Sequence, residues 1–143
     1  MPNVQQLLNA KSPGLWTISS TASVYEALEL MAQKEIGALP VVDNGQIVGM
    51  FSERDYARKV ILKGRASKTT TVGELMASKI FFVRSDATVE QCMALMTEKH
   101  IRHLPVLNDH KLIGIISIGD LVKAIITDQA ITIQSLQDYI TGR

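Results

Sequence analysis

The chain contains one structural unit twice. When the sequence is displaced by 65 residues, residues 18–61 lie over residues 83–126 without a gap, and 14 of these 44 positions are identical. The identical pairs include Pro40/Pro105, Gly49/Gly114, Ser52/Ser117 and Asp55/Asp120. Because repeated units of this kind bury their apolar faces against each other, the pattern predicts a fold built from two similar halves. Any site proposed in one half can therefore be sought in the other.

Each copy carries the same order of local signals. A capping box, formed by Ser23 with Glu26 and by Thr88 with Gln91, marks the expected start of a helix in each copy. The apolar residues that follow it recur at the spacing of one helix face. Two apolar runs separated by a turn follow, and the turn in the first copy is Asp43-Asn44-Gly45. A strand is expected before the first helix and a second helix after the hairpin. The apolar runs span 38–42 and 46–51 in the first copy, and 104–107 and 112–117 in the second.

The predicted fold class is α/β, with two β-α-β-β-α repeats packed by pseudo-twofold symmetry. Such packing would create paired clefts between the copies. The chain divides into an N-terminal segment, a first motif, a linker, a second motif and a C-terminal helix. Their boundaries are 1–14, 15–63, 64–78, 79–127 and 128–143. A short helix is expected over residues 4–10.

Composition excludes several classes of function. Lys and Arg total 15 against 14 Asp and Glu, so a net charge of +1 gives no reason to expect nucleic-acid binding. No apolar run approaches the roughly 18 residues that would cross a bilayer, and no secretory leader is evident. The single cysteine, Cys92, falls on the apolar face of a helix, which indicates a core residue. We expect a cytoplasmic protein with no membrane partner.

The pattern Ser-x-x-Asp stands at the start of the second helix of each copy, as Ser52 with Asp55 and Ser117 with Asp120. Helix capping explains the pattern without any ligand, because Ser is a good N-cap and Asp complements the helix dipole. A carboxylate in this place can also accept hydrogen bonds from both hydroxyls of a ribose. The helix N-terminus offers N–H groups to phosphate. Both interpretations remain open from the residues alone.

Motifs of catalysis are missing from the sequence. There is no G-x-S-x-G elbow, no Walker loop and no G-x-G-x-x-G fingerprint. No cluster of Cys, His and Asp shows metal-ligand spacing, so no metal is expected. The chain is therefore not expected to be an enzyme, although a minor activity on a bound nucleotide is a third hypothesis.

The doubled pattern resembles the cystathionine-β-synthase (CBS) motif. The resemblance is carried by Ile36-Gly37-Ala38-Leu39-Pro40-Val41-Val42 with Ile47 to Asp55, and by Ile101-Arg102-His103-Leu104-Pro105-Val106-Leu107 with Leu112 to Asp120. It covers about residues 15–127 and is similar to a subgroup of stand-alone CBS-pair proteins. It implies a regulatory module that binds AMP, ADP, ATP, NAD or S-adenosylmethionine as ligand. It also implies a homodimer and a regulated protein that the sequence does not identify.

The resemblance also implies a set of nucleotide-binding residues in each copy. Asp120 and Asp55 would hold ribose, with Ser117 and Ser52 adding contacts. The adenine slot would be lined by the segment before the first helix and by residues before the motif proline. These are Thr17 (with Trp16 and Ile18), Gly37 and Ala38 in the first copy, and Ile80, Phe81, Phe82, Arg102 and His103 in the second. Core packing is the other explanation for Ile80, Phe81 and Phe82, and it must hold for at least one of them.

The two sites are not expected to be equal. A nucleotide held by Asp120 would point its phosphate toward Arg54, whose planar fork suits phosphate. A nucleotide held by Asp55 would face Ile118 and Gly119, which carry no charge. A surface ion pair with Glu53 or Asp55 is the other explanation for Arg54. Basic residues near the linker could extend the anion site or simply form a solvated face, and these are Arg58, Lys59, Arg65 and Lys68.

A second class of function competes with nucleotide sensing. In it, the Ser-x-x-Asp pairs are only caps, and the chain is a ligand-independent interaction protein. The terminal helices would then carry assembly or partner binding.

Overall fold

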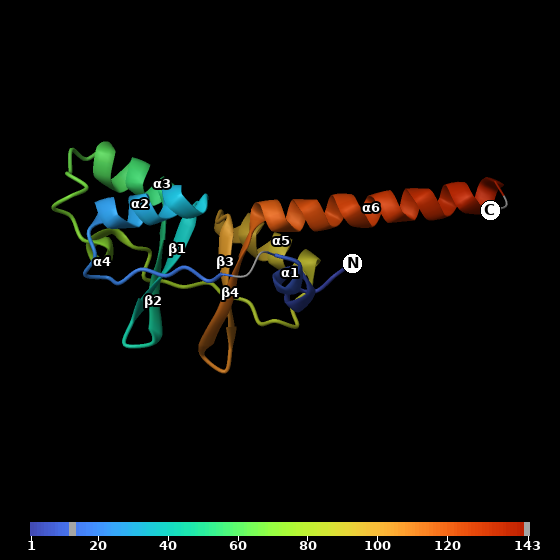
Figure 1. The fold of residues 1–143 in the computed structure, drawn as a ribbon, viewed down its shortest axis with the longest axis horizontal. Coiled ribbons are helices and arrows are strands. Elements are labelled where there is room, and N and C mark those ends of the chain that lie inside the picture. Colours follow the sequence, from blue (N-terminus) through green and yellow to red (C-terminus); the bar gives the residue numbers. More distant parts are fainter. Residues whose placement is uncertain (12–13, 142–143) are drawn as a thin grey trace. The chain divides into compact units, whose positions relative to one another are not determined.

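The computed structural model describes residues 1–11 and 14–141 (Figure 1). Contacts divide the chain into two units. Among the described residues, unit 1 comprises 1–11, 82–108 and 113–141, and unit 2 comprises 14–81 and 109–112. Each unit holds most of one repeat together with a segment from outside that repeat.

Unit 2 is built on an antiparallel hairpin covered by helices. The hairpin pairs β1 (Ala38–Asp43) with β2 (Gln46–Ser52). Around it lie α2 (Val24–Lys34), the single turn α3 (Glu53–Asp55), the π-helical η1 (Tyr56–Ile61) and α4 (Val72–Leu75). The core joins the hairpin to α2, η1 and α4, and Met31, Leu39 and Phe51 are among its fully buried side chains.

Unit 1 repeats this plan with longer helices. Its hairpin pairs β3 (His103–Asn108) with β4 (Lys111–Ser117). The helices are α1 (Val4–Ala10), α5 (Val89–Lys99) and α6 (Ile118–Thr141). Cys92 is fully buried on α5 beside Met96, which confirms its interpretation as a core residue. Burial raises the pKa of its thiol.

The sequence-based prediction of α/β structure is confirmed, with two differences in detail. The strands expected around residues 16–18 and 80–82 shorten to single bridges, which join Ile18 to Val41 and Val83 to Val106. The second helix of copy two and the expected C-terminal helix merge into one continuous α6 of 24 residues. Although α6 is long, no helix in the described part of the chain, α6 included, is both long and apolar enough to cross a membrane.

Both hairpin turns need two residues in the left-handed region. Asn44 and Gly45 have φ angles of 50° and 75°, and Asp109 and His110 have φ angles of 50° and 66°. Two positive φ angles are the signature of the type I′ turn, whose twist matches that of the strands it joins. The repeat thus keeps its turn geometry even where histidine replaces glycine.

Each hairpin is completed by a short helix from outside its own repeat. In unit 1, α1 docks through hydrogen bonds from the backbone of Val4 and Gln5 to the carbonyls of Ala87 and Ser85, at 2.9 Å each. In unit 2, α4 docks through Val72 and Gly73 on the carbonyls of Ala22 and Ser20, at 2.9 and 2.8 Å. Because Ala22 and Ser20 match Ala87 and Ser85 in the repeat, α1 and α4 are equivalent elements.

Glycines in the second strands make room for these short helices. A Cβ on Gly114 would lie 2.6 Å from the Leu8 side chain, and a Cβ on Gly49 would lie 2.6 Å from the sulfur of Met76. At Gly49 the backbone oxygen of Ala77 is also only 2.9 Å away, and it is fixed by a 2.9 Å hydrogen bond from Met50.

We predict that Gly49→Ala destabilises the protein by about 1–3 kcal/mol, because backbone atoms cannot move aside for the new methyl group. The matched variant Gly114→Ala should cost less, since only the flexible end of Leu8 must rotate. Urea denaturation of both variants measures the difference. An equal or larger loss in Gly114→Ala would contradict this packing argument.

Candidate functional site

In unit 1, the Ser-x-x-Asp pattern forms a capping box where β4 meets α6. The backbone N–H of Asp120 donates to the Ser117 hydroxyl at 3.1 Å, and the backbone N–H of Ser117 donates to Oδ2 of Asp120 at 2.8 Å. The capping interpretation is therefore correct as a description of the geometry. It leaves Oδ1 unused, because no described residue donates to that oxygen.

A lysine from a distant part of the chain reaches the same carboxylate. The ammonium of Lys11, at the end of α1, donates to Oδ2 of Asp120 at 2.8 Å and to the carbonyl of Ile115 at 2.9 Å. The Lys11 and Asp120 side chains are 34% and 23% exposed, so the pair is partly buried and still in contact with solvent. Nothing in the repeat pattern pointed to Lys11, which lies outside both copies.

These contacts keep the Asp120 carboxyl ionised. Burial by itself would raise the pKa of Asp120, but the hydrogen bonds from Lys11 and Ser117 outweigh it and hold the pKa below its ordinary value. The neighbouring His103 responds in the opposite way. Burial lowers the pKa of its imidazole, and the charge of Lys11 lowers it further, so His103 is neutral at pH 7.

Unit 2 presents a similar carboxylate where β2 meets α3. Oδ2 of Asp55 accepts from the backbone and the hydroxyl of Ser52, both at 3.0 Å, and the Asp55 backbone donates to that hydroxyl at 3.2 Å. Oδ1 of Asp55 forms an ion pair with Lys59, at 3.2 Å. Both carboxylates are thus paired with a lysine, but the two lysines come from unrelated elements.

The residues before the motif prolines lie next to these junctions. The Gly37 carbonyl accepts from the backbone of Glu53 at 3.0 Å, and Ala38 pairs with Ser52 across the hairpin. In unit 1, the Arg102 carbonyl accepts from the backbone of Ile118 at 2.8 Å. The structure therefore brings each predicted base-slot loop to the helix start that carries the Ser-x-x-Asp pattern.

A family comparison identifies this arrangement. The model of the CBS domain matches residues 9–62 and 72–127. The chain belongs to the CBS-domain family. It is 39% identical over 146 residues to the mitochondrial CBS domain-containing protein CBSX3 of Arabidopsis thaliana, covering 98% of this chain and 71% of that protein.

Solved structures agree with this assignment. A putative signal-transduction protein with CBS domains from Burkholderia ambifaria is 52% identical, with a TM-score of 0.86 over 90% of this chain and 96% of its own. The CBS domain pair of protein MJ0100, solved with 5′-methylthioadenosine and S-adenosyl-L-methionine, is 25% identical, with a TM-score of 0.78 over 89% of this chain and 98% of its own. Other similar structures include a hexameric CBS-CP12 protein and Hypoxic Response Protein I with two zinc ions.

The aromatic and apolar residues expected to line the adenine slot of the second CBS motif are not core residues. Phe82 is 50% exposed, and Ile80 and Phe81 are half-buried. The expectation that at least one of them is buried in the core is therefore wrong. The division into units falls between Phe81 and Phe82, and Val83 pairs with Val106 of its motif in a single bridge.

Other predicted site residues lie on the surface of unit 2. Thr17 is exposed, and its neighbour Trp16 is covered by the ammonium of Lys34, 4.1 Å from the ring centre. Lys68 lies over the ring of Tyr25, 5.0 Å from its centre. Arg54 is exposed on α3. Since Asp120 belongs to unit 1, its expected cooperation with Arg54 stays a prediction.

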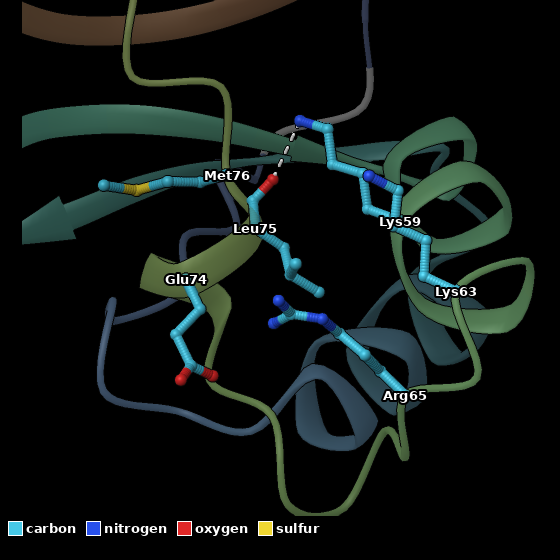
Figure 2. Close-up of a pocket in the computed structure, with 6 residues that line it drawn as sticks. All are labelled: Lys59, Lys63, Arg65, Glu74, Leu75 and Met76. Carbon is cyan, nitrogen blue, oxygen red and sulfur yellow. Dashed lines mark hydrogen bonds between the residues drawn. The ribbon is translucent and has the colours of Figure 1, made fainter.

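A basic pocket of about 280 Å³ is lined in part by Lys59, the ion-pair partner of Asp55 (Figure 2). Lys59, Lys63 and Arg65 line one side of it, and Glu74, Leu75 and Met76 line the other. Lys59 connects the pocket to the carboxylate, because it also donates to the Leu75 carbonyl at 3.1 Å. Arg65 and Leu75 point toward one another in Figure 2. Cations therefore lie near Asp55, although the sequence analysis expected a nucleotide held by Asp55 to face only the uncharged Ile118 and Gly119.

The part of the chain that the structure describes forms no candidate metal site. No three His, Cys, Asp or Glu side chains gather there in a way that could hold an ion.

We predict that the stabilising contribution of the Asp120 carboxylate depends on pH. Because the folded-state pKa is lowered, the contribution is complete above the unfolded pKa of about 3.9 and is lost as the pH falls through the folded value. The difference in unfolding free energy between wild type and Asp120→Asn should therefore be largest near pH 7 and shrink below about pH 4.

Urea denaturation at several pH values measures this difference. In a Lys11→Met background the pH-dependent part of the difference should be smaller, because the main contact that lowers the folded-state pKa is gone and the folded and unfolded values lie closer together. A difference that does not change with pH would show that the carboxylate acts only through its shape and neutral hydrogen bonds.

Proposed function

We propose that this CBS pair is a regulatory module that binds an adenine nucleotide and catalyses no reaction. The observation that carries the proposal is the ionised Asp120 carboxylate at the start of α6, whose Oδ1 accepts no hydrogen bond from any residue that the structure describes. An ionised carboxylate only accepts hydrogen bonds, and the two hydroxyls of a ribose are suitable donors. The N–H groups at the same helix start favour a phosphate nearby.

Relatives support the class of ligand. The CBS pair of protein MJ0100 was solved with two adenosyl compounds, and this chain shares its fold over most of its length. Ligand identity is a finer matter: AMP, ADP, ATP, NAD and S-adenosylmethionine all present the same adenosine group. Sensing of energy or cofactor state would follow if their affinities differ.

Charge favours phosphorylated ligands at both carboxylates. For Asp120 we propose that Arg54 supplies the phosphate contact, as expected from the sequence. Asp55 has Lys59 beside it, and Lys59 also lines the basic pocket, so the Asp55 site is better provided with cations than the sequence suggested. Lys63 and Arg65 form no ion pair with any described residue, which leaves their charge available to an anion.

Calorimetric titration of nucleotide-free protein with AMP, ATP, NAD and S-adenosylmethionine tests the proposal. We expect binding of at least one ligand, and a loss of about tenfold to a hundredfold in Asp120→Asn, the range for hydrogen bonds to a charged group. Asp138→Asn, which makes the same chemical change far along α6, is the control. Folded protein that binds none of the four ligands would refute the proposal.

The Arg54 contribution is separated in the same assay. Arg54→Ala should lower the affinity for AMP and leave the affinity for adenosine, which has no phosphate, unchanged. An unchanged AMP affinity would remove Arg54 from the site.

A second candidate function is assembly through α6, and a specific surface favours it. Ile126, Ile133 and Ile140 recur every seven residues along α6, and each is more than half exposed. Val122 and Leu136 fall on the same stripe, because they lie four residues before Ile126 and three after Ile133. Figure 1 shows this half of α6 extending past α1 and α5 of the same unit. A seven-residue apolar repeat is the pattern by which two helices pair.

We propose that the partner of this stripe is a second copy of the chain, since a self-complementary stripe can pair about a twofold axis. The variant Ile133→Glu with Leu136→Glu should convert the dimer to a monomer in analytical ultracentrifugation. Gln134→Glu with Gln137→Glu, which adds the same charge to other positions of α6, should leave the mass unchanged. A wild-type monomer, or a dimer that survives Ile133→Glu with Leu136→Glu, would exclude α6 pairing.

A further inference from the structure

Lys11 is held in place by the fold of unit 1. It caps the end of α1, where its backbone N–H donates to the Leu8 carbonyl at 3.3 Å. α1 is itself fixed by its two backbone hydrogen bonds to residues 85 and 87 and by the fully buried Val4. The Lys11 ammonium therefore has a defined position beside Asp120, and it needs no ordering when a ligand arrives.

Among the residues that the structure describes, the Lys11–Asp120 pair leaves one donor and one acceptor without a partner. An ammonium has three N–H donors, and two of those on Lys11 are used by Asp120 and Ile115. The carboxylate has two oxygens, and both of its described donors go to Oδ2. The third N–H and Oδ1, which have no described partner, belong to the two groups of one 2.8 Å hydrogen bond, so they are close neighbours.

Helix stability does not account for the position of Lys11. The start of a helix carries a partial positive charge, which repels an ammonium and attracts a carboxylate. Asp120 already satisfies the first turn of α6 through the capping box. A cation held at this end of the helix is therefore unfavourable for the helix itself.

In both motifs the aspartate carboxylate is paired with a lysine, but the lysine comes from a different element in each. Asp55 is paired with Lys59 of its own helical segment, and the matching position in the second motif is Ala124. Lys11 replaces the missing cation from a different element. A lysine next to each carboxylate is thus common to both motifs, although the sequence repeat does not encode it.

We propose that Lys11 is a ligand-contacting residue of the Asp120 site and that, with Asp120, it recognises the vicinal 2′- and 3′-hydroxyls of a ribonucleotide. Each ribose hydroxyl is both a donor and an acceptor, so one diol can donate to Oδ1 of Asp120 and accept from the ammonium of Lys11. We assign the 3′-hydroxyl to Oδ1 of Asp120 and the 2′-hydroxyl to Lys11, so a 2′-deoxy ligand loses the lysine contact and keeps the carboxylate contact. The inference rests on the proposed function and adds ribose selectivity to it.

The test compares AMP with 2′-deoxy-AMP by calorimetry. It is done in an Asp55→Asn background, which removes the other ribose acceptor. Lys11→Met keeps the length of the side chain and removes its charge and donors. We expect this variant to bind AMP about tenfold more weakly and 2′-deoxy-AMP almost as before, because a hydrogen bond from a charged donor is lost only for the diol. Lys123→Met, an exposed position on α6, is the control and should change neither affinity.

The possible results separate cleanly. Selectivity for AMP that falls in Lys11→Met and returns in Lys11→Arg supports the inference. Tighter AMP binding in Lys11→Met would show that Lys11 competes with the ligand, and an equal loss for both nucleotides would show a general effect of charge; either result overturns it. If the Asp55→Asn protein binds neither nucleotide, the inference fails, and wild-type titration then shows whether the proposed function fails with it.

Discussion

The exchange of short helices between the two CBS repeats is the constraint on which the rest of the structure depends. Neither hairpin is covered by its own repeat alone. The segment that precedes the first repeat supplies α1 to unit 1, and the segment that precedes the second supplies α4 to unit 2. Val4 and Val72 are fully buried at equivalent places. Because Lys11 ends α1, the same exchange delivers the cation that accompanies Asp120.

The helix starts combine a structural and a functional role in one carboxylate. In both Asp120 and Asp55, Oδ2 accepts the backbone hydrogen bond of the capping box, and this bond fixes the side chain. A carboxylate fixed in this way loses little conformational entropy on binding a ligand. The capping and ribose interpretations of Ser-x-x-Asp are therefore compatible, since the cap orients the group that would bind.

Local signals predicted much of the fold, because they depend on neighbours in sequence. The caps at Ser23 and Thr88 form as expected, and Thr88, unlike Ser23, shows both hydrogen bonds of the capping box. The hairpins and the buried Cys92 also follow from period and turn chemistry. α4 was missed because it is only four residues long, too short for a period to show. The bridges at Ile18 and Val83 fell short of strands because a single residue pairs at each.

The candidate site was harder to predict because part of it is not local. Lys11 and Asp120 are 109 residues apart, and α1 aligns with α4 at an offset of 68 residues, whereas the main repeat has an offset of 65. That shift of three hides the equivalence from a search at one spacing. Whether Arg54 serves Asp120 depends on the placement of two units, which no sequence pattern fixes.

The helix exchange also sets an order of events during synthesis. α1 is made before any of its partners in unit 1 exist, and its docking carbonyls at Ser85 and Ala87 are about eighty residues further along the chain. Contacts between segments so far apart close late, since a long loop must first be ordered. α2 and the first hairpin, by contrast, meet α4 almost as soon as it leaves the ribosome. Unit 2 should thus be folded before α1 can dock, and Val4 and Leu7 should stay exposed to water until the second repeat is complete.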